Sequence, residues 1–191
     1  MSGKTLISVF DKSGLVEALA PLHKLGYTER LASAGTAKLL TESGMPTDDV
    51  ASLVGGGPIL GHKVVTLSRE VHAGLLASEA EQAELNELGI PRIEILIVGF
   101  YPLHAALVDP GRTLASVLQS LDIGGPTMVM SAVKGGRIVV VDLNDIPQLV
   151  RYLKGELSDG PGFLATLWWK AAARVAEYYA SLAMYLNEYR R

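Results

Sequence analysis

The sequence contains no cysteine, which excludes disulfide bonds, thiolate metal sites and cysteine nucleophiles. It has no apolar run near the roughly 20 residues that a membrane-spanning helix needs, and its first residues lead into no apolar core of the signal-peptide type. Charged residues make up only 19% of the chain and the net charge is −3, so composition gives no reason to expect nucleic acid or an anionic membrane as a partner. These absences predict a cytoplasmic protein that holds any anionic ligand with local donors.

Apolar residues are plentiful, at 49% of 191 residues, which is enough for a buried core. Short apolar runs alternate with helical patterns, and this spacing predicts an α/β fold, a parallel sheet flanked by helices on both faces. We expect residues 1–191 to form a single domain that ends in a long C-terminal helix over about 161–191. Strands are predicted at 6–9, 30–33, 47–53, 64–67, 93–98 and 137–142. Helices are predicted at 11–24, 36–44, 69–77, 79–88 and 146–154, and on both sides of residue 122.

The stretch from Asp122 to Lys134 carries the most chemistry. Asp122 leads into Gly124 and Gly125, where the backbone can approach a ligand closely, and Pro126 suits the first turn of a helix. Lys134 would lie about two turns along that helix from Pro126. One interpretation is an acid and an ammonium placed around a small polar molecule. The other is an ordinary loop-to-helix joint with a capping Asp and a solvated Lys.

Two turns rich in small and hydroxyl residues follow the first two predicted strands. The carboxyl ends of neighbouring parallel strands share one edge, and helix starts at that edge favour phosphate through their N–H groups and dipole. Helix capping would explain either turn by itself, but two turns on one edge predict a phosphate or phosphoribosyl site. The candidate residues are Lys12, Ser13, Gly14, Ser33, Gly35 and Thr36.

Several motifs, all in the same order, resemble those of the IMP cyclohydrolase family, whose domain closes the purine ring in the last step of IMP synthesis. Residues 122–127 are DIGGPT, the family signature, and residues 71–76 match its VHAGLL. Residues 7–14 resemble ISVSDKTG, residues 32–37 resemble STGGTA, and Tyr101-Pro102 matches the YP of NLYPF. The resemblance covers residue 5 to about residue 185. It implies a methylglyoxal-synthase-like fold, a three-layer architecture of Rossmann type.

The implied reaction is the dehydrative ring closure of 5-formamidoimidazole-4-carboxamide ribonucleotide (FAICAR) to IMP. It needs a proton acceptor for the amide nucleophile and a donor for the oxygen that leaves as water, but no redox group or carrier, so no cofactor is expected. No histidine pair has a metal-ligand spacing, so no metal is predicted. Asp122, Lys134 and Tyr101 carry over as catalytic residues, although Tyr101 could equally belong to an ordinary turn. The implied substrate-binding residues are Lys12, Ser13, Gly14, Ser33, Gly35, Thr36, Thr66, Ile123, Gly124 and Gly125.

The sequence departs from the family within the site itself. Where the family has RVKTLHP, residues 63–69 are KVVTLSR, so Val65 replaces a catalytic lysine and Ser68 replaces a histidine. Lys63 lies two residues before Val65 and would face the same way on an extended strand, so we hypothesise that Lys63 supplies the missing ammonium. Further departures are Phe10 for serine, Gly99 for asparagine, Met130 for arginine, and Gly135-Gly136 for asparagine-histidine.

The resemblance also implies partners. Family domains pair, so a homodimer is expected, and relatives continue into a formyltransferase that a separate chain would have to supply here. Two other functions stay open: a regulatory relative that binds purine nucleotides without catalysis, and a methylglyoxal synthase-like phosphate lyase. The substitutions at Phe10, Val65 and Met130 favour the regulatory relative, while the retained acid, lysine and tyrosine favour the enzyme. The DIGGPT and Tyr-Pro segments argue against the lyase, and a pure interaction module would leave both phosphate-type turns without a use.

Overall fold

The computed structural model of the chain describes residues 3–60 and 63–190. It contains a five-stranded, wholly parallel sheet in the order β3-β2-β1-β4-β5. The strands are β1 (Lys4–Val9), β2 (Arg30–Ala32), β3 (Asp48–Asp49), β4 (Ile93–Gly99) and β5 (Ile138–Val140). The strand order reverses between β1 and β4, and ligands of parallel α/β sheets bind outside the carboxyl ends of the strands at such a point.

Nine α-helices and three short 3₁₀ helices surround this sheet within the described ranges. The α-helices are α1 (Leu15–Lys24), α2 (Ala34–Glu42), α3 (Arg69–Leu76), α4 (Gln82–Glu87), α5 (Leu103–Val108), α6 (Leu114–Gln119), α7 (Gly124–Lys134), α8 (Ile146–Leu153) and α9 (Gly160–Tyr189). The 3₁₀ helices are η1 (Val50–Ser52), η2 (Glu79–Glu81) and η3 (Leu143–Asp145). Within residues 3–60 and 63–190, no helix combines the length and the apolar composition that spanning a bilayer requires.

The two faces of the sheet are buried in two separate apolar clusters, because alternate side chains of each strand point to opposite faces. Ile7 and Ile97 belong to a first cluster with residues of α1, α2 and α8. Leu6 and Leu96 belong to a second cluster with residues of α3 and α7. The predicted parallel sheet with helices on both faces is therefore confirmed.

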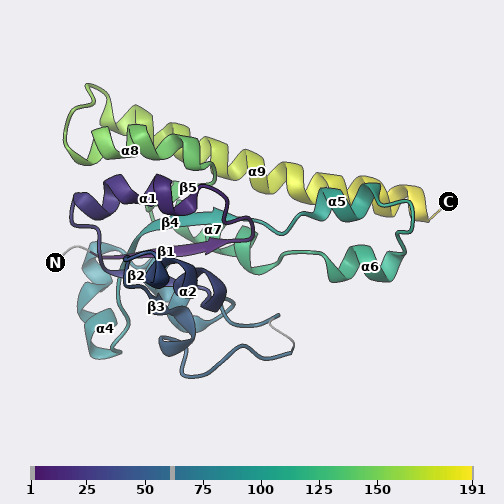
Figure 1. Ribbon diagram of the computed structural model, residues 1–191, viewed down its shortest axis with the longest axis horizontal. Coiled ribbons are helices and arrows are strands. Elements are labelled where there is room, and N and C mark those ends of the chain that lie inside the picture. Colours follow the sequence, from purple (N-terminus) through teal and green to yellow (C-terminus); the bar gives the residue numbers. More distant parts are fainter. Residues whose placement is uncertain (1–2, 61–62, 191) are drawn as a thin grey trace.

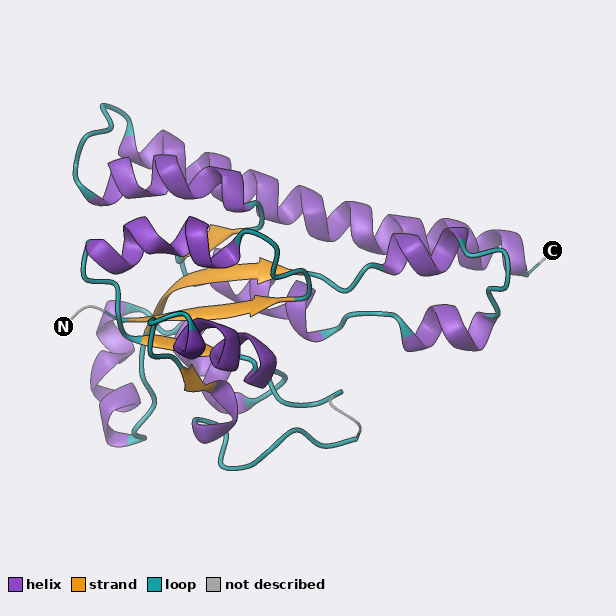
Figure 2. Ribbon diagram, in the orientation of Figure 1, coloured by secondary structure: helices purple, strands orange, loops and turns teal. Residues whose placement is uncertain are grey.

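Helix α9 joins the two clusters. Its first turns place Phe163 and Leu167 in the first cluster, and its middle places Ala171 and Val175 in the second. Figure 1 shows α9 running along one side of the molecule, with its C-terminal part extending beyond the sheet beside α5. The strand arrows in Figure 2 point toward the end of the molecule that carries α5 and α6. The long C-terminal helix is confirmed, and part of it reaches the end of the molecule where the strands finish.

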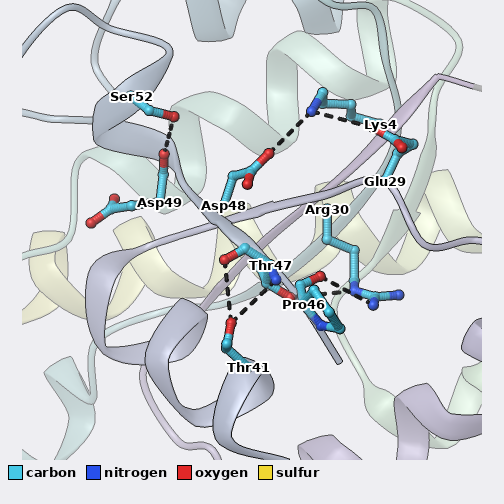
Figure 3. A network of polar contacts seen from close by, with 9 residues as sticks. All are labelled: Lys4, Glu29, Arg30, Thr41, Pro46, Thr47, Asp48, Asp49 and Ser52. Atoms are coloured by element: carbon cyan, nitrogen blue, oxygen red, sulfur yellow. Dashed lines mark hydrogen bonds and ion pairs between the residues drawn. The ribbon is translucent and has the colours of Figure 1, made fainter. Parts of the chain in front are cut away.

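The short strands β2 and β3 are fixed by polar contacts (Figure 3). Arg30 is only 4% exposed, and its guanidinium donates to the carbonyl of Pro46 at 3.2 Å and to Oγ1 of Thr47 at 3.3 Å. At the start of β1, the Lys4 ammonium lies 3.4 Å from the Asp48 carboxylate. These contacts hold the residues that lead into β3 against β2 and tie the first residue of β3 to β1, although β3 contains only two residues.

Some local predictions were wrong. Residues 64–67 form no strand, because only Val64 pairs, in a single bridge to Ile59. The strand predicted at 47–53 is reduced to β3, since η1 begins at Val50. The first helix begins at Leu15 instead of Asp11, because the Asp11 carboxylate accepts the Ser13 N–H at 2.9 Å and forms a separate turn. The predicted C-terminal segment ends at residue 191, which lies outside the described residues.

Candidate active site

Asp122 lies in the turn before α7, beside the loop that follows β4. Its carboxylate accepts two backbone hydrogen bonds, from the N–H of Gly125 to Oδ1 at 2.9 Å and from the N–H of Tyr101 to Oδ2 at 3.3 Å. The first bond belongs to the start of α7 and the second comes from a different loop. The DIGG turn therefore presents a carboxylate whose orientation is fixed from two sides, near the switch point of the sheet.

Burial raises the pKa of the Asp122 carboxyl above its ordinary value, and the backbone N–H groups of Gly125, Tyr101 and Gly124 oppose this shift only in part. No lysine or arginine of the described chain forms an ion pair with Asp122. A carboxylate with a raised pKa is a stronger base than an ordinary one, which is what a proton acceptor for a poor nucleophile requires.

The two glycines of the motif are required by close packing. A Cβ at Gly124 would lie 2.6 Å from Oγ1 of Thr66, and a Cβ at Gly125 would lie 2.7 Å from Oδ2 of Asp122. Thr66 is buried, and its hydroxyl thus lies beside the turn. The structure thus brings Asp122, Gly124, Gly125 and Thr66 together. Ile123, which lies between the acid and the glycines, is 42% exposed.

Tyr101 is 45% exposed and packs against Phe10, at the end of β1. The two rings meet edge to face, with centroids 5.5 Å apart. Together with Pro102 and Ala105 they line a groove of about 420 Å³ that runs toward α5 and α6. The residue that departs from the family serine is therefore a neighbour of the predicted catalytic tyrosine.

The two predicted phosphate-binding turns lie side by side, because β1 and β2 are neighbouring parallel strands. The Lys12 side chain reaches across to the second turn, where a Cβ at Gly35 would lie 3.9 Å from its Cε. In that turn the Ser33 hydroxyl lies 3.2 Å from the hydroxyl of Thr36, which is fully buried. The arrangement places two hydroxyl groups and the end of the Lys12 side chain at the start of α2, with the Lys12 ammonium donating to the carbonyl of Phe10 at 3.3 Å.

In the first turn, Gly14 has a φ of 69°, a left-handed conformation that favours glycine. The Asp11 carboxylate accepts the N–H of Ser13 at 2.9 Å. Hydrogen bonds from Ser13 hold the pKa of Asp11 below its ordinary value. The carboxylate of Asp11 is thus ionised beside the predicted anion site, which places a negative charge close to the Lys12 ammonium.

A larger groove of about 710 Å³ opens at the carboxyl ends of β1, β4 and β5, beneath α9. Its lining includes Asp11, Phe100, Asp142, Lys170 and Arg174. No group of three or more histidine, aspartate or glutamate side chains among residues 3–60 and 63–190 is placed to hold a metal ion.

Neither of the two predicted catalytic lysines pairs with Asp122 in the structure. Lys134 is exposed at the last position of α7, about 15 Å along the helix axis from Gly124 at the rise of an α-helix. Lys63 is exposed in the loop before α3, and it does not sit on the extended strand that was expected to direct it. Within a single chain, neither ammonium forms an ion pair with the carboxylate.

Two departures from the family have structural roles in this loop. Val65 packs against the second apolar cluster instead of carrying a charge. The Ser68 hydroxyl accepts the N–H of Val71 at 3.2 Å and so caps α3, as serine commonly does at a helix start. Nearby, Nδ1 of His72 lies 2.8 Å from the hydroxyl of Ser131, a contact that joins α3 to α7.

Sequence reasoning missed two aromatic residues of the site. The Tyr178 hydroxyl, on α9, accepts the backbone N–H of Asp122 at 2.8 Å. The Phe100 ring lies against Gly125, since a Cβ there would be 2.8 Å from its Cδ1. Tyr178 is 56 residues from Asp122 along the chain, and no sequence pattern links a tyrosine in an apolar helix to a distant backbone N–H.

The fold and the site define the class of protein, an MGS-like domain. Residues 14–127 match the MGS-like domain, which is more than half of the chain, and the chain belongs to this family. A crystal structure of ForH superimposes on the chain with a TM-score of 0.79 and 29% sequence identity, covering 97% of both chains.

The curated relatives are more specific. The chain is 39% identical over 192 residues to the bifunctional purine biosynthesis protein PurH of Neisseria gonorrhoeae (strain ATCC 700825 / FA 1090), covering 96% of this chain and 36% of that protein. It is 36% identical over 194 residues to PurH of Synechococcus sp. (strain WH7803), covering 98% of this chain and 37% of the relative. The chain thus spans little more than a third of the length of the curated relatives it matches.

Proposed function

We propose that the chain acts in purine biosynthesis as an IMP cyclohydrolase, closing the ring of FAICAR to give IMP and water. The observation that supports this most is the Asp122 carboxylate. It is fixed by the N–H groups of Gly125 and Tyr101, its pKa is raised by burial, and it lies on the DIGGPT turn. The similarity to PurH proteins supports the same assignment.

In the proposed reaction, the carboxamide nitrogen attacks the formyl carbon and forms the new C–N bond. Each Asp122 oxygen accepts one backbone N–H and keeps a free lone pair, so the carboxylate can accept an amide N–H of the substrate and take its proton. The formyl oxygen leaves as water, with one proton from the carboxamide nitrogen and one from the formamide nitrogen. Both reacting groups belong to one molecule, so their orientation supplies much of the rate.

The substrate phosphate is proposed to bind at the first two turns, with Lys12 supplying the charge and Ser13, Ser33, Gly35 and Thr36 supplying donors. Thr66, Ile123, Gly124 and Gly125 would then border the heterocycle next to Asp122. Tyr101 is exposed enough to contact the substrate or to relay a proton. Lys134 remains a predicted catalytic residue on the resemblance, whereas Lys63 remains a hypothesis without the extended strand from which it was argued.

The test is to incubate the purified protein with FAICAR and follow IMP formation by chromatography. We expect turnover in the wild type and its loss in Asp122→Ala. The matched control is Asp48→Ala, which removes an exposed carboxylate at the amino end of the sheet. Lys134→Ala and Lys63→Ala test the two lysines, with the exposed Lys24→Ala as their control.

A regulatory role is the second candidate, because no cation of the described chain pairs with Asp122 and Val65 is part of the apolar packing. Calorimetry with IMP distinguishes the two. Binding without turnover would support a nucleotide sensor, whereas turnover that survives Asp122→Ala would contradict the proposed mechanism.

A homodimer is proposed as the working form. Its support is the number of large apolar side chains that α9 leaves exposed, among them Trp169 at 67%, Met184 at 67% and Tyr189 at 59%. Sedimentation equilibrium of the wild type and of Met184→Glu checks this. We expect a dimer that the substitution weakens, and a wild-type monomer would contradict it.

A further inference from the structure

Helix α9 reaches the candidate site through one side chain, Tyr178. Its hydroxyl accepts the backbone N–H of Asp122 at 2.8 Å. Burial raises the pKa of Tyr178 to about 12, so the phenol stays protonated at neutral pH and accepts through a lone pair. The contact holds the backbone of the turn and leaves the Asp122 carboxylate free for the substrate.

The Tyr178 ring supports the same turn from a second direction. It meets the Phe100 ring edge to face, with centroids 5.2 Å apart and planes at 74°. Phe100 in turn lies against Gly125, whose N–H donates to the Asp122 carboxylate. One tyrosine therefore supports both the backbone of the acid and one of the two donors that orient it.

Helix α9 is itself anchored to the body of the protein ahead of this contact. Nε1 of Trp168 donates to the carbonyl of Arg137 at 2.7 Å, and the Lys170 ammonium lies 2.6 Å from the Asp145 carboxylate. A helix that is fixed in this way presents Tyr178 at a defined position, instead of as part of a mobile tail.

We propose that Tyr178 is a positioning residue through which the C-terminal helix sets the orientation and basicity of the Asp122 carboxylate. The proposal rests on the proposed function for its catalytic consequence, but not for its structural one. Without the hydroxyl, the half-buried N–H of Asp122 would have no acceptor, which is unfavourable, and the turn would reorganise. The carboxylate would then lose part of its bonding to the N–H groups of Gly125 and Tyr101, which favour its ionised form.

The test compares Tyr178→Phe, which removes only the hydroxyl, with Tyr179→Phe. Tyr179 is the adjacent half-buried tyrosine, and its ring contacts that of Tyr178 with centroids 5.8 Å apart, so it is a matched control. The first readout is the pKa of the Asp122 carboxyl in the ligand-free protein, followed by carbon NMR. The ionisable side chains coupled to Asp122 are those of Tyr178 and Tyr179, and burial raises the pKa of both phenols, so both stay neutral over the carboxyl titration. We expect the pKa of Asp122 to rise in Tyr178→Phe and to stay unchanged in Tyr179→Phe.

The second readout is the pH profile of IMP formation. For Tyr178→Phe we expect kcat to fall about tenfold with KM within about twofold, and the acidic limb of the profile to move to higher pH. An unchanged carboxyl pKa together with an unchanged acidic limb in Tyr178→Phe would overturn the proposal. A third test needs only the wild type: rapid hydrogen exchange of the Asp122 amide would also overturn it. A shifted carboxyl pKa in a protein without turnover would refute the proposed function and support the positioning role.

Discussion

Replacing Gly125 by alanine is the smallest change that disturbs the candidate site directly. The added methyl carbon would lie 2.7 Å from Oδ2 of Asp122 and 2.8 Å from Cδ1 of Phe100, which is about 0.7 Å closer than ordinary van der Waals contact for the first pair. Gly125 is in a helical conformation, so the backbone itself accepts alanine. The strain therefore falls on the carboxylate and on the aromatic ring.

The effect on stability is expected to be small, since two contributions oppose each other. Overpacking costs about 1–3 kcal/mol, and alanine in place of glycine within a helix contributes about 1 kcal/mol in the other direction. The net loss of unfolding free energy is then about 0–2 kcal/mol. Activity is affected more strongly, because moving a catalytic group by about 1 Å can cost about a hundredfold in rate.

The assay measures urea unfolding and the initial rate of IMP formation for Gly125→Ala and for Gly57→Ala. Gly57 has open space around its Cβ position, so its replacement introduces an alanine without a clash. We expect kcat of Gly125→Ala to fall between about tenfold and a hundredfold while the protein stays folded, and the control to match the wild type. A Gly125→Ala enzyme with wild-type kcat would refute the placement of the carboxylate against this glycine.

Three further predictions concern stability. Because the pKa of Asp122 is raised in the folded chain, ionising this carboxyl costs stability as pH rises through the carboxyl range. In urea titrations, Asp122→Asn should therefore gain stability relative to wild type between about pH 3 and about pH 7. A difference in unfolding free energy that stays constant with pH contradicts this. In Gly135→Ala the new methyl carbon meets the carbonyl of Leu75, which is a backbone group and cannot rotate away. Calorimetry should show a loss of about 1–3 kcal/mol in unfolding free energy, and wild-type stability would refute that contact. Lys170→Met leaves the largely buried Asp145 carboxylate without its cation, and urea unfolding should show a loss of about 1–3 kcal/mol, with an unchanged midpoint as the contrary result.

Most of the architecture could be predicted from the chain because its long apolar runs have a single interpretation. Residues 93–98 are continuously apolar except for Glu94, and they form a central strand with neighbours on both sides. The failures occurred where the chain is short of such signals. Val64 to Leu67 have strand-forming residues, but side-chain packing against the second apolar cluster holds Val65 without a ladder of hydrogen bonds. Strand propensity reflects packing of this kind as much as pairing.

The candidate site was predictable where its residues are adjacent in sequence or end neighbouring strands. Asp122 meets Gly125 within one turn, and Lys12 meets Gly35 because β1 pairs with β2. Tyr178 could not be predicted in this way, since its contact depends on how α9 lies across the finished sheet. Helical spacing placed Lys134 correctly, about two turns beyond Pro126 and at the last position of α7. Such spacing gives the position of a residue along its own helix, but not which distant groups that position meets.

The resemblance to the cyclohydrolase family implies a lysine at position 65, where this chain has Val65, and such a lysine would bear on the pKa of Asp122. A lysine ammonium beside the carboxylate would favour the ionised form and lower the pKa, opposing burial. Val65 instead packs into the apolar cluster. The backbone N–H groups of Gly125, Tyr101 and Gly124 lower the pKa of the Asp122 carboxyl, but burial raises it by more. A site of this kind stabilises the developing oxyanion less, but its carboxylate is a stronger base. Under the proposed function, the chain would therefore rely on Asp122 as proton acceptor without an ammonium of the described chain paired to it.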